Sequence, residues 1–124
     1  MKNILLHIFL FAFAFANSQT NFKPTASLQP EFDSLIHLLK KKDEHCISYL
    51  KEVRKKYDAM NSSGKDLARE TMGAMYRRVT KFCQVSLKTE EGVKFAIEAI
   101  SLLEKTENKS ELANAYTLFG LMMH

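Results

Sequence analysis

Two stretches of the sequence decide the fold: Ala68-Arg69-Glu70-Thr71-Met72-Gly73-Ala74-Met75 and Ala115-Tyr116-Thr117-Leu118-Phe119-Gly120-Leu121-Met122. In each, a glycine follows an alanine at the same separation, and apolar residues surround the pair. Small residues let two helices approach closely, and the large residues beside them fill the grooves between the helices. The echo therefore predicts antiparallel helical hairpins that stack on one another, an arrangement suited to binding rather than to catalysis.

The composition agrees with an all-α fold. Of the 124 residues, 46% are hydrophobic and 26% are charged, with only four glycines and two prolines. This balance is typical of a small globular protein and is too apolar for a disordered chain. The formal net charge of +4 suits nucleic acid or anionic lipid, but an exported chain is not expected to meet nucleic acid, so we predict no nucleic-acid partner.

Residues 1–18 have the three parts of a secretory signal peptide. Lys2 supplies the positive charge, and an apolar run follows over residues 4–16. Either Ala14 and Ala16 or Ala16 and Ser18 provide the two small residues of a cleavage site. The apolar run is shorter than the ~20 residues that span a bilayer. We therefore predict a cleaved signal peptide and no stable membrane span in the mature chain.

The run Ser18-Gln19-Thr20 resembles the ends of signal peptides in the Bacteroidetes group of bacteria. It favours export, to the periplasm or into the medium. Residues 19–29 are polar, contain Pro24 and are predicted to form a linker, which leaves residues 30–124 as the helical domain.

Apolar spacing and turn residues predict five helices in this domain. The clearest spacing, in steps of four and three, is that of Cys46, Leu50, Val53, Tyr57 and Met60. The sharpest break follows, at Asn61-Ser62-Ser63-Gly64. The predicted helices are residues 31–41, 43–60, 65–86, 90–105 and 110–124. The predicted N-caps are Ser63, Thr89 and Ser110.

A packing pattern of bulky and small residues runs through residues 67–124. Its members are Met72, Gly73, Tyr76, Ala96, Ile100, Leu103, Tyr116, Phe119 and Gly120. The pattern resembles tetratricopeptide repeats, in which antiparallel helix pairs stack into a short α-solenoid. Two features depart from that family: Arg69 stands at a bulky apolar position, and the two glycines lie 47 residues apart (120 − 73) against a period of about 34. A generic helical bundle is the alternative.

The resemblance implies a non-catalytic protein that mediates protein or peptide interaction, with no cofactor and no catalytic residues. The alternative is the N-terminal sensor fragment of a signalling or transcriptional regulator that contains such repeats. Residues 118–123 are apolar nearly all round, and no polar cap follows them. Because an exposed apolar helix needs a partner, we expect the chain to be a fragment of a longer repeat protein or to self-associate through residues 110–124.

The clustered metal-ligand residue types are His37, Asp43, His45 and Cys46. The two histidines are eight positions apart, whereas two imidazoles on one helix share an ion at a spacing of four. We therefore predict surface histidines and no metal site. Cys46 and Cys83 face one another across the predicted hairpin with an offset of about four residues, so a disulfide and a pair of buried thiols both stay open.

Basic residues gather on two helices that are predicted to be neighbours. They are Lys51, Arg54, Lys55 and Lys56 on the first helix, and Arg77, Arg78 and Lys81 on the second. Together they can present a surface for an anionic ligand. Charge on a helix face is usually solvated, and we favour that interpretation for both groups.

Overall fold

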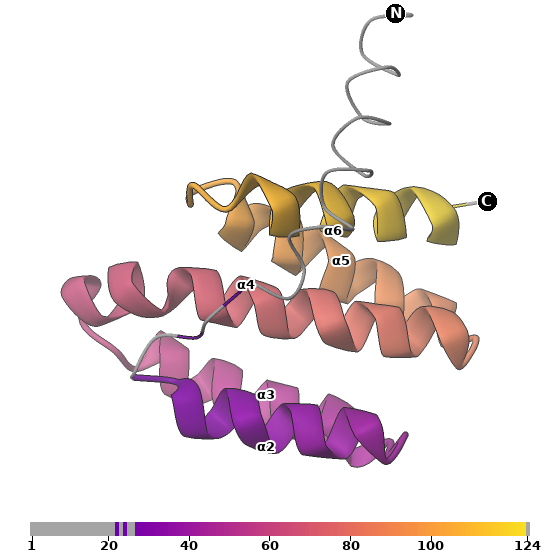
Figure 1. The fold of residues 1–124 in the computed structure, drawn as a ribbon, viewed down its shortest axis with the longest axis horizontal. Helices are drawn as coiled ribbons and strands as arrows, with labels where there is room; N and C mark the ends of the chain where they lie inside the picture. Colours follow the sequence, from indigo (N-terminus) through magenta and orange to yellow (C-terminus); the bar gives the residue numbers. More distant parts are fainter. Residues whose placement is uncertain (1–21, 23, 25–26, 124) are drawn as a thin grey trace, which may run out of the picture.

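The computed structural model describes Phe22, Pro24 and residues 27–123, and this part of the chain is all-helical (Figure 1). Its five helices are α2 (Gln29–Lys40), α3 (His45–Asp58), α4 (Ser62–Val85), α5 (Thr89–Leu103) and α6 (Lys109–Met122). No β-strand occurs among these residues, so the predicted all-α fold class is confirmed. The predicted signal peptide, residues 1–18, lies outside the described residues, as does most of the predicted linker.

The helices are stacked as antiparallel hairpins in two layers. In Figure 1, α2, α4 and α6 lie one above another in the near layer, and α3 and α5 lie behind them. The long helix α4 is the centre of the stack, because it contacts each of the other four helices. A helix surrounded in this way is buried on almost every face, and residues 71–77 of α4 are all buried.

Asparagine side chains cap the two hairpin helices α4 and α6. The side-chain oxygen of Asn61 accepts a hydrogen bond from the backbone N–H of Gly64 at 2.8 Å, and that of Asn108 accepts from Glu111 at 3.0 Å. The predicted N-cap role of Thr89 is wrong, because Thr89 is the first residue of α5 and Lys88 is in the N-cap position. Ser63 and Ser110 lie inside the helices, so their predicted capping roles are wrong too. Each has an asparagine two positions earlier, and asparagine is at least as good an N-cap as serine.

Residues with a left-handed backbone end α2 and α4 without the help of glycine. Lys42 has φ of 56° and Leu87 has φ of 61°. After α2, the N–H of Asp43 donates to the carbonyl of Leu38 at 3.0 Å, which is the six-residue closure of a Schellman turn. Lys42 of this turn lines a cavity between α2 and α4.

The small residues of the packing pattern bring α4 and α5 together. A Cβ added to Gly73 would lie 2.7 Å from Cγ of Leu103, so only glycine fits between these helices without a shift. Met72, Ala96 and Leu103 are fully buried and Tyr76 is almost so. Ile100 is half-buried against the same core.

The other end of the pattern packs differently from the prediction. Tyr116 is 44% exposed, and a Cβ added to Gly120 would meet nothing within 4 Å. Their predicted packing roles are therefore wrong for the described part of the chain, and Phe119 is only half-buried. The cause is the rotation of α6, whose buried residues are Glu111, Ala115, Leu118 and Met122. Tyr116 and Gly120 fall on the opposite side.

The end of the predicted linker belongs to the core. Leu28 is fully buried, and its carbonyl accepts a hydrogen bond from the N–H of Phe32 at 2.9 Å in the first turn of α2. Within the described ranges, no helix combines the length and the apolar character needed to cross a membrane.

Candidate functional site

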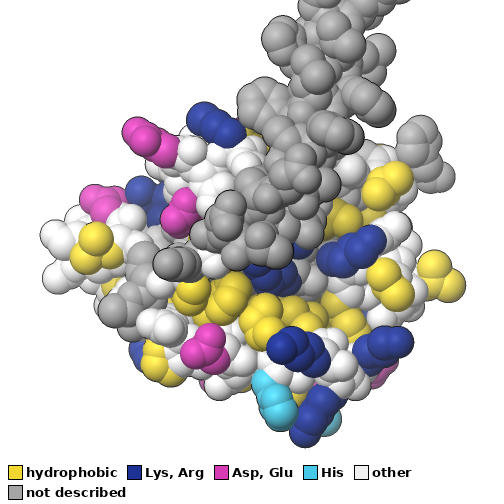
Figure 2. Space-filling model, viewed as in Figure 1, with side chains coloured by type: hydrophobic (Ala, Val, Ile, Leu, Met, Phe, Trp, Pro, Cys, Tyr) yellow, Lys and Arg dark blue, Asp and Glu magenta, His cyan; other side chains and the backbone are white. Residues whose placement is uncertain are grey.

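A cavity of about 480 Å³ opens between α2 and α4. Its apolar lining comes from Ile36 and Leu39 of α2 and from Phe82 and Val85 of α4. Its charged and polar lining consists of Lys40, Lys42, Glu44, Arg77, Arg78, Lys81 and Ser86. Figure 2 shows this face as a band of hydrophobic side chains bordered by Lys and Arg. A volume of this size is typical of ligand sites in proteins.

Helical spacing explains why these residues meet. On α2, Leu39 and Lys40 follow Ile36 at three and four positions, which places them on one face. On α4, Arg78 and Lys81 are followed by Phe82 and Val85 on a second such face. The contact between the two helices sets these faces beside one another.

The charge of the lining is strongly positive. Its carboxylate, Glu44, already pairs with Lys88 at 3.4 Å, while Lys81 donates to the side chain of Gln84 at 3.1 Å. Lys40 and Lys42 have no ion pair with any described residue. Cations that line a hollow with an apolar floor attract anions, because the field of such a surface is focused into it.

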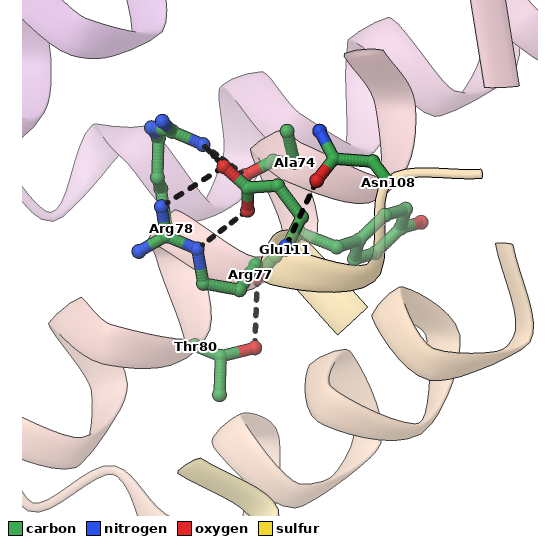
Figure 3. A network of polar contacts seen from close by, with 7 residues as sticks. Ala74, Arg77, Arg78, Thr80, Asn108 and Glu111 are labelled. Atoms are coloured by element: carbon green, nitrogen blue, oxygen red, sulfur yellow. Dashed lines mark hydrogen bonds and ion pairs between the residues drawn. The ribbon is translucent and has the colours of Figure 1, made fainter. Parts of the chain in front are cut away.

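A buried ion pair lies beneath this positive lining (Figure 3). Arg77 of α4 donates to both carboxylate oxygens of Glu111 of α6, from Nε at 2.9 Å and from Nη2 at 3.3 Å. The side chains of Arg77 and Glu111 are 9% and 2% exposed. Asn114 adds an acceptor at 3.0 Å from Nη1 of Arg77 in the amide orientation that satisfies both of its polar atoms. The pair therefore ties α6 to the middle of α4.

Arg78 joins the same carboxylate from the cavity side. Its Nη1 donates to Oε1 of Glu111 at 3.2 Å and to the carbonyl of Ala74 at 3.1 Å. Its guanidinium carbon lies 5.0 Å from the ring centroid of Phe32 and 5.3 Å from that of Phe22, which are cation–π distances. Burial, followed by the charge of Arg77, lowers the pKa of Arg78. Two guanidinium groups thus share one carboxylate.

The alternative considered for the basic residues, one anion-binding surface across the two neighbouring helices α3 and α4, is not the arrangement at this cavity. On α3, Arg54 pairs with Asp58 at 2.9 Å and with Glu98 of α5 at 2.8 Å, and Lys56 pairs with Glu31. None of the predicted α3 cations lines the cavity. Instead, Lys40 of α2 and Lys42 of the following turn line the cavity together with the three cations of α4.

The predicted solvated position of Arg77 is wrong, and the sequence pattern does not single out Glu111. The sequence does carry a signal for each of these two residues. Arg77 and Arg78 interrupt a nearly continuous run of small and apolar residues in α4, and Glu111 lies three residues after the capping residue Asn108. Glu111 lies in the first turn of α6, and its carboxylate contacts Arg77 of α4.

The two cysteines are free and fully buried. The structure thus has the buried-thiol alternative and no disulfide between Cys46 and Cys83. Burial raises the pKa of both thiols to about 11. A thiol is nucleophilic only as thiolate, so neither cysteine is prepared for chemistry near neutral pH.

The residues considered as metal ligands do not converge. His45 and Asp43 form an exposed pair with 2.7 Å between Nδ1 and Oδ1, whereas Cys46 is buried in the core. Within the described part of the chain, no group of three or more His, Cys, Asp or Glu side chains is arranged to hold a metal ion.

Fold and site together define an all-helical chain with a cation-lined cavity on one face. Comparison with protein families, with curated proteins and with solved structures finds no match. The resemblance to tetratricopeptide repeats therefore stays a prediction.

Proposed function

We propose that this chain is a non-catalytic binding protein that takes an acidic, partly apolar segment of a partner protein into the cavity between α2 and α4. The observation that carries the proposal is the lining itself, in which five cations surround four apolar side chains. The cations complement acidic side chains, and the apolar side chains of the lining can bury Leu-like or Phe-like side chains of the partner away from water.

The lining favours a peptide segment over a nucleic acid. Single-stranded nucleic acids are held by several aromatic side chains on which successive bases stack. Phe82 is the aromatic residue of this cavity's lining, and it is half-buried against the core. A peptide uses both halves of the lining, because apolar and acidic side chains can alternate along it.

We also propose that the protein is exported, to the periplasm or into the medium. Support comes from the sequence of residues 1–18 alone. Expression of the full chain in a Gram-negative host tests this. The mass of the recovered protein should show cleavage near Ala16 or Ser18, and an uncleaved chain that stays in the cytoplasm would contradict it.

Fluorescence anisotropy with a labelled helical peptide of Leu, Ala and Glu tests the proposed function. We expect saturable binding that weakens with added salt, because the attraction is partly electrostatic. A peptide with Lys in place of Glu should not bind. Saturable binding of both peptides with equal affinity, or of neither, would contradict the proposal.

Two variants on one helix provide a matched pair for this assay. Val85 lines the cavity and is 67% exposed, while Leu67 lies near the other end of α4 and is 68% exposed. Val85→Asp should therefore weaken binding with little effect on folding. Leu67→Asp should leave binding unchanged. Equal effects of the two variants on peptide affinity would show that the peptide binds outside this cavity.

A further inference from the structure

Resting on the proposed function, we infer that the neighbouring arginines have different tasks: Arg77 holds α6 in place, and Arg78 binds a carboxylate of the acidic segment. Both line the cavity, and both contact Glu111. They differ in how their hydrogen-bond donors are used.

The hydrogen-bond donors of Arg77 are used within the fold. Arg77 forms the two-pronged contact with Glu111, and Asn114 accepts from the same guanidinium. A planar guanidinium matches a carboxylate in this way at its two parallel N–H groups. Because its side chain is also almost fully buried, Arg77 has little freedom to turn toward a ligand.

Two nitrogens of the Arg78 guanidinium make no hydrogen bond to a described residue. An arginine side chain has five N–H donors. The two hydrogen bonds of Arg78 to described residues are both donated by Nη1. Nε and Nη2 have no acceptor among the described residues. The contacts with Phe22 and Phe32 are to their rings and use no donor of this edge. Nε and Nη2 form the edge that can donate two parallel hydrogen bonds to the two oxygens of a carboxylate.

The local charge favours the same ligand. One carboxylate, Glu111, serves two guanidinium groups, which leaves an excess positive charge in a largely buried place. Burial and the neighbouring charge of Arg77 lower the pKa of Arg78, while the charge of Glu111 opposes this shift. A carboxylate on the Nε and Nη2 edge would balance this excess charge, with Lys81 on the next turn of α4 adding a second cation.

The test is a comparison of two peptides on four proteins. The peptides are the labelled Leu, Ala and Glu peptide and its counterpart with Gln in place of Glu. The proteins are the full chain and its variants Arg78→Gln, Arg77→Gln and Arg69→Gln. Arg69, near the start of α4, pairs with Asp66 at 2.9 Å, does not line the cavity and is the matched control.

We expect Arg78→Gln to weaken binding of the Glu peptide about tenfold or more, the scale of a lost charge-assisted hydrogen bond. The same variant should leave binding of the Gln peptide unchanged. Arg69→Gln should affect neither peptide. Arg77→Gln should lower the urea midpoint of unfolding, whereas Arg78→Gln should lower it less.

Loss of preference for Glu over Gln in Arg78→Gln supports the inference, because a merely misfolded variant would lose both peptides. If the full chain binds the Glu peptide and Arg78→Gln keeps the same preference, the role of Arg78 is wrong while the proposed function stands. If neither peptide binds the full chain, the proposed function itself has failed.

Discussion

Arg77 and Glu111 are 34 residues apart in the sequence and form a two-pronged ion pair inside the protein, with oxygen to nitrogen distances of 2.9 and 3.3 Å. The pair connects the central helix α4 with the last helix α6, at the base of the cavity. Fold and proposed site thus depend on the same side chains.

Glu111→Gln should destabilise the protein by about 3 to 5 kcal/mol, the range seen when one partner of a buried ion pair is removed. Two buried guanidinium groups would then face a neutral side chain. Urea unfolding followed by circular dichroism measures the change. Glu107→Gln is the control, since Glu107 is exposed in the loop before α6 and should be neutral. Equal stability of the two variants would show that the pair is not important for folding.

The two glycines of the sequence echo should respond in opposite ways to alanine. Gly73→Ala should cost about 1 to 3 kcal/mol, because its Cβ would overlap the side chain of Leu103. Gly120→Ala should stabilise by up to about 1 kcal/mol, since alanine favours the helix and the space around Gly120 is open. Thermal unfolding of both variants checks this. Destabilisation by Gly120→Ala would mean that α6 packs differently.

The periodicity of apolar residues was sufficient to predict the five helices, their hairpin turns and the burial of Met72 and Leu103. It failed for Arg77 because a stripe on one face describes a helix at the surface, whereas α4 is surrounded by four others. It failed for Tyr116 and Gly120 because sequence similarity does not fix the rotation of a helix about its axis. The buried face of α6 includes Glu111, whose carboxylate forms an ion pair with Arg77 of α4.

The cavity could not be predicted either. Lys40 and Lys42 reach it only because α2 ends in a left-handed turn at Lys42 and lies against the second half of α4. Such a meeting of residues about forty positions apart depends on how the helices pack, and local spacing carries no signal of it.

The buried thiols should make stability fall at high pH. Burial raises the pKa of Cys46 and Cys83 from 9.0 to about 11, so in this range the folded chain binds more protons than the unfolded chain. Their contribution to the free energy of unfolding should be complete below pH 9 and decline between pH 9 and 11. Urea unfolding at several pH values should show a shallower decline in Cys46→Ala and Cys83→Ala. An identical slope in these variants would contradict this.

Self-association through α6 stays a prediction with a direct test. Leu121 and Met123 are exposed, and α6 has no charged side chain after Glu111. Sedimentation equilibrium should show a concentration-dependent dimer that Leu121→Lys disrupts, with Leu67→Lys as the control. A monomer at every concentration would show that the exposed face of α6 needs no partner.

The central claim, that an acidic and partly apolar peptide occupies the cavity between α2 and α4, is tested most directly by methyl NMR. The labelled protein would be titrated with the Leu, Ala and Glu peptide. We predict saturable shifts of the methyl signals of Ile36, Leu39 and Val85, which line the cavity, and none for Ile97 and Leu121, which are exposed elsewhere. Saturable shifts at Ile97 and Leu121 with none at the cavity residues would contradict the claim.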